Sequence, residues 1–199
     1  MQLNYTDAVM EMLGERTSPV PFVGSWDDLE SELGVRLPED YKRILEKYAP
    51  VQLNGHVFLE HPHTRRWNLG QWMRGTVEAF SRSKFTEDDC PTMPGGPVFG
   101  GPAGLIPLLS TDRGEYLFGI ARMVGSHSGE WILLSCDGDE QGFYEYRMSF
   151  SEWFYRHLIG ESMFGPGSAV FYPGPIVFES MPMTYEERSV SWQGPERGM

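Results

Sequence analysis

The feature that most constrains this chain is a series of four runs rich in β-branched and aromatic residues, separated by short polar connectors. The runs are LIPLLST (105–111), EYLFGIA (115–121), EWILLSC (130–136) and GFYEYR (142–147). Such runs are typical of β-strands. The connectors DRG, VGSHSG and DGDEQ are short enough to favour hairpins between consecutive strands. The sequence therefore predicts an antiparallel meander.

An amphipathic helix is predicted directly after the last run, within SFSEWFYRHLIGE. Ser149 and Glu152 have the spacing of a capping box, in which each side chain satisfies a backbone N–H at the helix start. The apolar face that follows consists of Phe150, Trp153, Phe154, His157 and Leu158. We expect this helix to lie across the sheet, with His157 at the edge of the core.

A pair of short helices is predicted between Ser25 and Pro50. Ser25 and Asp28 fit a capping box for the first helix, and Gly34 stands where a left-handed C-terminal cap is needed. The apolar face of this helix is Trp26, Leu29 and Leu33.

The second helix of the pair is expected to open with Pro38 in its first turn, where a missing N–H costs nothing. Glu39 and Asp40 follow in the first turn, where the helix dipole favours negative charge. The predicted buried face is Tyr41, Ile44, Leu45 and Tyr48.

The residues of this helix pair carry a resemblance to a known family. The pattern is Trp26, Leu29, Leu33, Gly34, Leu37, Pro38, Asp40 and Tyr41. It closely resembles the opening signature of the SUKH superfamily, which groups bacterial toxin-immunity proteins with a fungal regulator of cell-wall assembly. The similarity extends over residues 25–161. The Asn54-Gly55 pair comes later than in the family, and the Pro/Gly-rich stretch 86–104 departs from its pattern.

The resemblance implies a single α+β domain with an antiparallel-rich sheet and helices packed against it. It also implies a protein partner, because members of the family are typically encoded beside polymorphic toxins and neutralise them by direct binding. The family has no catalytic residues to carry over. Its signature residues are therefore interpreted as structural.

The flanking segments are predicted with less detail. Residues 1–24 are expected to form a helix near 5–13 and a linker, before the domain at 25–161. Within the domain we predict a strand at 56–60 after Asn54-Gly55, a helix at about 69–80, and a loose loop at 86–104. Residues 162–199 are expected to be an extension with a hairpin around Pro173-Gly174-Pro175 and a frayed tail.

Composition limits the classes of function. The chain has 28 acidic and 16 basic residues and a net charge of −12, which disfavours nucleic-acid binding and suits a basic protein partner. No apolar run approaches the ~18 residues of a membrane span, and the first residues lack a signal-peptide pattern. Two distant cysteines, Cys90 and Cys136, disfavour a disulfide scaffold or zinc site and indicate a cytoplasmic protein.

Three motifs superficially suggest chemistry. The segment 125–129 (GSHSG) has His where a nucleophile elbow needs Ser, and it joins two predicted strands. His61 and His63 lack further ligands at metal-binding spacing, so a solvated loop is favoured. The glycines of 95–104 are not followed by the Lys of a phosphate-binding loop. We therefore expect no catalytic residue, no cofactor and no metal.

Two acidic clusters are the candidate partner-binding residues. Asp137, Asp139 and Glu140 lie in one predicted turn, and Glu87, Asp88 and Asp89 lie at the start of the Pro/Gly-rich loop. An EF-hand is disfavoured because an aromatic strand occupies the place of its later ligands. Each cluster is either a solvated acidic loop or a docking surface for basic side chains, and the first cluster is the preferred candidate because its hairpin is rigid.

The leading hypothesis for function is an immunity-type protein that covers the basic cleft of a nuclease or deaminase toxin. The alternative is a regulatory or scaffold module similar to the fungal cell-wall regulator. An enzyme is the third hypothesis, and it lacks a nucleophile–base pair, a metal set or a phosphate loop. Gene neighbourhood distinguishes the first two.

Overall fold

The four β-rich runs pair in sequence order, as their short connectors predict. They form β3 (Ile106–Thr111), β4 (Tyr116–Val124), β5 (His127–Cys136) and β6 (Phe143–Tyr146). Each strand is antiparallel to the next, with Pro107 opposite Phe118, Leu117 opposite Ser135, and Cys136 opposite Phe143. The predicted meander is therefore confirmed, and its β4–β5 hairpin extends further than the apolar runs alone indicate.

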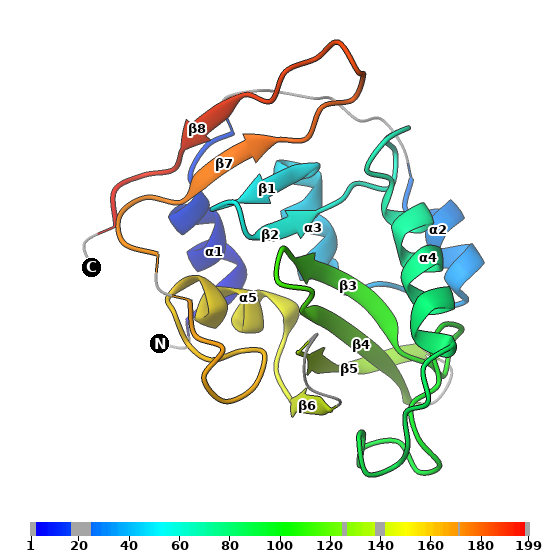
Figure 1. Cartoon of the computed structure of the whole chain (residues 1–199). Coiled ribbons are helices and arrows are strands. Elements are labelled where there is room, and N and C mark those ends of the chain that lie inside the picture. The colour runs from blue at the N-terminus through cyan, green and yellow to red at the C-terminus, as the bar shows by residue number, and fades with distance from the viewer. Residues whose placement is uncertain (1–2, 17–24, 125–126, 138–141, 171, 198–199) are drawn as a thin grey trace.

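The complete sheet is larger than the meander. The computed structural model describes residues 3–16, 25–124, 127–137, 142–170 and 172–197, and over these ranges the chain forms one α+β domain. Its antiparallel sheet has the order β6-β5-β4-β3-β2-β1-β7-β8 (Figure 1). The remaining strands are β1 (Val51–Leu53), β2 (Val57–Leu59), β7 (Val177–Ser180) and β8 (Ser191–Gln193). The helices are α1 (Tyr5–Leu13), α2 (Asp27–Leu33), α3 (Glu39–Tyr48), α4 (Leu69–Ser81) and α5 (Phe150–Leu158).

The predicted helices all form, and one predicted cap is wrong. Ser25 Oγ accepts a hydrogen bond from the backbone N–H of Asp27 at 3.1 Å, so Ser25 pairs with Asp27 and not with Asp28. The reason is that α2 begins at Asp27, so its N-cap residue is Trp26 and not Ser25. Trp26 has helical backbone angles and makes no side-chain cap bond. Gly34 ends α2 in the left-handed conformation at φ 70°, as predicted. Pro38 is the residue before α3 and not a member of its first turn.

The Asn54-Gly55 turn joins two strands where the sequence predicts one. Both residues have positive φ, 52° and 64°, and the N–H of His56 donates to the carbonyl oxygen of Leu53 at 2.9 Å, which closes a tight turn between the strands. The additional strand β1 is only three residues long and begins shortly after the end of α3. Such a short apolar run does not identify a strand in the sequence. The backbone N–H of Val177 also donates a hydrogen bond to the side-chain oxygen of Asn54 at 2.8 Å, which connects β7 to this turn.

Both faces of the sheet are covered. Leu109, Leu117 and Leu133 belong to the main core, which the helices α1, α3 and α5 share. The neighbouring residues Phe118 and Leu134 belong to a second cluster on the other face. Because side chains alternate along a strand, the unbroken apolar runs of β4 and β5 are explained by burial on both sides.

The closing helix α5 is capped as predicted and buried more deeply than predicted. Ser149 Oγ accepts the backbone N–H of Glu152 at 3.1 Å. Trp153, Phe154 and Phe150 are almost fully buried in the main core. His157 is also fully buried, which corrects its expected place at the edge of the core.

The C-terminal segment corrects two expectations. No strand forms at 169–170 or at Tyr172, so the predicted hairpin around Pro173-Gly174-Pro175 is wrong, and residue 171 lies outside the described part. The predicted strand at 176–180 does form as β7, but it pairs with β1 and β8. The tail is not frayed over its described residues, because Arg197 donates hydrogen bonds to the carbonyl oxygens of Gly174 and Leu158. These partners are distant in sequence, so local composition does not reveal them.

Candidate functional site

Asp137, from the first predicted acidic cluster, and the second cluster at 87–89 lie at the same edge of the sheet. The backbone N–H of Phe143 donates to the carbonyl oxygen of Asp89 at 2.8 Å, and Phe143 pairs with Cys136, the residue before Asp137. Glu87, Asp88, Asp89 and Asp137 therefore form one surface, which we call the acidic edge. Asp139 and Glu140 lie outside the described residues. The loop after α4 and strand β6 both lie at the lower end of the molecule in Figure 1.

The carboxylates of the acidic edge have different roles. Asp89 accepts hydrogen bonds from the backbone N–H and hydroxyl of Thr86, at 2.6 and 2.9 Å. Glu87 accepts the backbone N–H of Gly95 at 3.0 Å. Both carboxylates therefore shape the loop itself. Asp88 is exposed and, among the described residues, its side chain has no hydrogen-bond or ionic partner.

The loop at 86–104 is packed, which corrects the expectation of a loose segment. Cys90 is fully buried in the second cluster together with Cys136. Phe99 contacts the rings of Phe118 and Phe143, with centroids 5.6 and 6.1 Å apart. Thr92 donates to Glu145 on β6 at 2.5 Å. The apolar residues that anchor the loop are spaced irregularly, so a search for periodic patterns does not detect them.

We predict that hydrogen exchange will distinguish the anchored from the exposed amides of this loop. The N–H groups of Gly100 and Leu105 donate to the carbonyl oxygens of Leu105 and Val98, at 2.9 and 2.8 Å. These amides should exchange about 100-fold or more slowly than unstructured ones. The amide of Asp88, which has no such bond among the described residues, serves as the internal control. Fast exchange at Leu105 would contradict the packed loop.

Three of the family-signature residues, Trp26, Asp40 and Tyr41, make contacts that hold elements of the fold together. Tyr41 is fully buried and donates its hydroxyl to the carbonyl oxygen of Leu108 on β3 at 2.8 Å. Trp26 packs edge-on against Tyr41 and donates its indole N–H to Glu46 at 2.7 Å. Asp40 accepts the backbone N–H of Ser151 at 2.7 Å, so it binds the first turn of α5. A carboxylate there satisfies an otherwise unpaired N–H and complements the helix dipole.

Glu30, inside the signature segment, is the buried centre of an ionic network that extends to the surface at Arg36. Its carboxylate lies 3.0 Å from Lys42 Nζ and 2.6 Å from an Arg36 nitrogen, and it accepts the N–H of Leu37 at 2.9 Å. Burial would raise the pKa of Glu30, but these hydrogen bonds outweigh it and hold the pKa below the ordinary value. The network connects α2, the following turn and α3, which keeps the signature region in one geometry.

The structure also gives the positions of the other motifs that the sequence suggested for chemistry. The predicted loop at 125–129 is shorter than expected, because residues 127–129 belong to β5, and residues 125–126 lie outside the described part. His61 is buried, and burial lowers its pKa to about 4, with the nearby charges of His63 and Arg16 adding to the effect. Among the described residues, no three His, Cys, Asp or Glu side chains are grouped to hold a metal ion. No helix in the described part is long and apolar enough to cross a membrane.

The two thiols are held in their neutral form. Burial raises the pKa of Cys136 to about 11, and the adjacent Asp137 carboxylate adds to this effect. Burial also raises the pKa of Cys90. Because the thiolate is the reactive form, neither cysteine is activated as a nucleophile at neutral pH.

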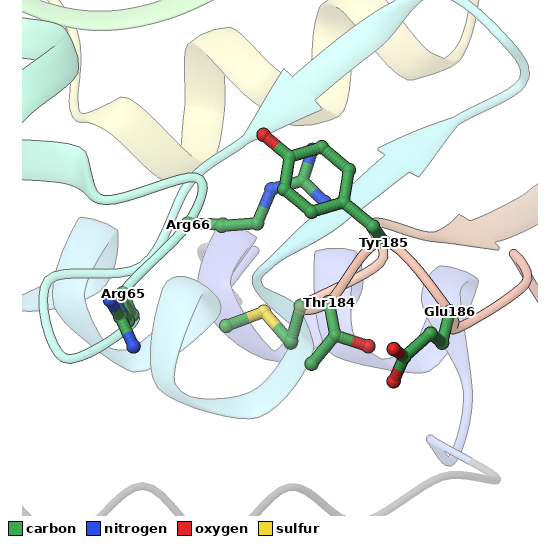
Figure 2. Close-up of a pocket in the computed structure, with 6 residues that line it drawn as sticks. Arg65, Arg66, Thr184, Tyr185 and Glu186 are labelled. Carbon is green, nitrogen blue, oxygen red and sulfur yellow. The ribbon is translucent and has the colours of Figure 1, made fainter.

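A second surface was missed by the sequence analysis. Arg65, Arg66 and Tyr185 line an open hollow of about 510 Å³ between the loop before α4 and the β7–β8 connection (Figure 2). The signal in the sequence is the pair Arg65-Arg66 directly before Trp67, in a chain with few basic residues. Its significance depends on Tyr185, which is about 120 positions away and has no distinguishing local pattern.

Comparison with known families decides the classification. The model of the SMI1 / KNR4 family (SUKH-1) matches residues 24–156, about two thirds of the chain. The chain belongs to the SMI1/KNR4 (SUKH-1) family. This match confirms the resemblance seen in the helix-pair signature. No curated protein and no solved structure matches the chain.

The family match spans the chain from the start of the helix pair into α5. The matched range 24–156 therefore contains the acidic edge and the loop at 86–104. The strands β7 and β8 lie beyond it, although they continue the same sheet. Tyr185 belongs to this added part, so the hollow lined by Arg65 and Arg66 is completed by residues outside the family match.

Proposed function

We propose that this protein is a non-enzymatic immunity protein that neutralises a toxin domain of the nuclease or deaminase class by direct binding. Its acidic edge would cover the basic substrate-binding cleft of the toxin. The single observation that carries this proposal is the convergence of Asp88 and Asp137, from two distant segments, on one edge of the sheet in a member of the SMI1/KNR4 (SUKH-1) family.

The packing of the acidic edge supports this role. Cys90 and Phe99 anchor the loop in the second hydrophobic cluster, so the carboxylates are held in place before a partner arrives. Binding then loses little conformational entropy, which is the main benefit of a preorganised surface. The net charge of −12 would also steer a basic partner toward the protein and speed its association.

The absence of enzymatic activity is part of the proposal. Both thiols have raised pKa values, and the glycine-rich stretch of the loop serves to cover the sheet. Free Cys90 and Cys136 lie in the same cluster, which suits a reducing compartment, so we propose a cytoplasmic location. A robust hydrolase activity of the pure protein that is lost on mutation of His127 would contradict this part.

The family name itself supports one alternative, a regulatory or scaffold module of the SMI1/KNR4 kind. Such a module would bind several partners and protect against no toxin. A toxin gene directly beside this one favours the immunity role, whereas an isolated gene favours the regulatory role.

Co-expression with the neighbouring gene product tests the proposal. We expect a stable complex and restored growth of cells that express the toxin domain. The informative variant changes Asp88→Asn, Asp137→Asn, Asp139→Asn and Glu140→Gln together, and it should weaken protection while the melting temperature stays nearly unchanged. The control variant changes Glu11→Gln and Asp28→Asn, two exposed carboxylates on other elements. A wild-type protein that neither forms the complex nor protects would contradict the immunity role.

A further inference from the structure

A rigid loop between β2 and α4 presents two arginines. Asn68 donates its side-chain N–H groups to the carbonyl oxygens of Pro62 and Thr64, at 2.7 and 2.8 Å. Thr64 Oγ lies 2.9 and 3.0 Å from the carbonyl oxygens of His61 and Trp67. These bonds close the loop on itself, so the exposed Arg65 is carried by a backbone that is already ordered.

Trp67 joins this loop to the β7–β8 connection. It has a φ of 55°, which is an uncommon backbone conformation for a bulky residue. Its indole N–H donates to the carbonyl oxygen of Pro182 at 2.9 Å. On the other side, Glu187 accepts the backbone N–H of Met183 at 2.6 Å, which orders the connection near Tyr185. Two segments distant in sequence are thus fixed against each other.

Arg66 is held between aromatic rings. Its guanidinium lies 4.6 Å from the ring centroid of Tyr185 and 5.6 Å from that of Trp67. Stacking on a ring face orients the guanidinium and leaves its N–H edge available for a planar acceptor. The ring of Tyr185 is 95% exposed, so little besides this contact accounts for its position.

Neither arginine has an ion-pair partner among the residues that the structure describes. Over the described ranges, the ion pairs involve other basic residues, and Arg65 and Arg66 take part in none. Figure 2 shows Arg65 and Glu186 at opposite ends of the hollow, with Thr184 between them. In a protein of net charge −12, two unpaired arginines beside an exposed aromatic ring form a local surface of opposite sign.

We propose that this arginine–aromatic surface binds a carboxylate-rich segment of a protein partner. Guanidinium groups bind carboxylates bidentately, and arginine, tyrosine, tryptophan and methionine are the residues enriched at protein interfaces. Tyr185 and Met183 supply apolar contact beside the two cations. A nucleic acid fits less well, because binding of its phosphate backbone requires an extended basic stripe and this surface presents two arginines.

This surface is independent of the acidic edge. It is built by the loop at 61–68 and the β7–β8 connection, whereas the acidic edge lies at the β5–β6 end of the sheet. The two have opposite charge, so they select different partners or different parts of one partner. Failure of either proposal leaves the other standing.

Fluorescence anisotropy with defined peptides tests the proposal. The probe is a fluorescein-labelled peptide, Gly-Glu-Glu-Phe-Glu-Glu-Gly, and the matched peptides carry Gln or Lys in place of every Glu. At low salt we expect the full-length protein to bind the Glu peptide at least tenfold more tightly than either matched peptide. Equal binding of the Glu and Gln peptides, or no binding of the Glu peptide, would overturn the proposal.

Variants locate the binding to this surface. Arg65→Gln with Arg66→Gln should weaken binding of the Glu peptide at least tenfold, and Tyr185→Ser should weaken it several-fold. Glu186→Gln should strengthen it about twofold or more, because it removes a like charge from the hollow. Arg43→Gln, an exposed arginine on α3, is the control and should change nothing.

Two results would overturn the assignment. One is equal loss of binding in the Arg43→Gln control and in the double arginine variant, which would indicate a general charge effect. The other is tighter binding of single-stranded hexathymidylate than of the Glu peptide, which would indicate a phosphate site. The arginines and Tyr185 lie at the surface, and unchanged melting temperatures will confirm that the variants fold.

Discussion

Replacing His157 with phenylalanine should make this protein more resistant to acid. His157 is fully buried on α5, and among the described residues neither ring nitrogen has a hydrogen-bond partner. Burial lowers its pKa to about 3, and the nearby charges of His56 and Arg113 act in the same direction. The ring contacts Trp153 and Phe164, with centroids 5.5 Å away in each case. A phenylalanine ring retains the contacts with these two aromatic residues and with the neighbouring rings of His56 and Tyr172, and it cannot acquire a charge.

The sign of the effect follows from linkage. The folded-state pKa lies below the unfolded value of about 6.5, so the unfolded chain binds a proton first as pH falls. The stability due to neutral His157 is therefore complete above about pH 6.5 and is lost progressively toward pH 3. By pH 4 the loss amounts to about 3 kcal/mol. Glu60 acts oppositely, because burial raises its pKa to about 7, so only the difference between variant and wild type isolates His157.

Urea unfolding at pH 7.5, 6, 5 and 4 measures this effect. The free energy of unfolding of the His157→Phe variant should exceed that of the wild type by an amount that grows toward low pH. The His63→Phe variant is the control for the loss of a histidine side chain, because His63 is only half-buried. A constant difference between the His157→Phe variant and the wild type across the series would show that folding does not lower the pKa of His157, which would contradict its burial.

Replacing Trp26 with alanine should cost about 3–5 kcal/mol of stability, as for other buried aromatic truncations. Trp26 is 8% exposed and packs against Tyr41 in the main core, and its indole N–H bonds to Glu46. The loss should lower the melting temperature by roughly 10 °C for a chain of this size. Trp26→Phe retains much of the packing and should lose only about 1–2 kcal/mol. A shift of one or two degrees for Trp26→Ala would contradict the structural role of the signature.

Local patterns account for the parts of this fold that the sequence reveals. The helices α1, α3 and α5 carry apolar residues at helical spacing, and Ser149 caps α5 where the capping pair predicts. The runs at 105–147 contain the four meander strands with changed ends. Each of these elements is decided by residues within about ten positions of one another. For that reason a single sequence is sufficient to place them.

The parts that the sequence does not reveal depend on distant contacts. Strand β8 forms because β7 offers it a partner, although Ser191–Gln193 is polar at both ends. The loop at 86–104, which was expected to be loose, is ordered by its contacts with Phe118 and Phe143 on the sheet. An indication was present in the uninterrupted apolar run of β5, since a strand with one solvated face alternates in polarity.

For the candidate sites, too, the sequence reveals which residues are present, and distant contacts decide how they are arranged. The acidic residues were identified from composition, but their common edge follows only from the bond between Phe143 and Asp89. The structure also shows which of these carboxylates are available to bind a partner. Glu87 and Asp89 hold the loop together, which leaves Asp88 as the exposed carboxylate of that trio. Tests of binding should therefore change Asp88 and the residues from Asp137 onward.

The central claim, that the acidic edge binds a basic toxin domain, is tested most directly by association rates. Stopped-flow mixing with the neighbouring gene product, at about 0.05 M and about 0.5 M salt, compares the wild type with the four-residue acidic-edge variant and the control variant. We predict roughly tenfold slower association for the acidic-edge variant at low salt, and nearly equal rates at high salt, where charges are screened within a few ångströms. The dissociation rate should change little. Equal association rates for wild type and acidic-edge variant at low salt, with no dependence on salt, would contradict the claim and show that the acidic residues serve solubility alone.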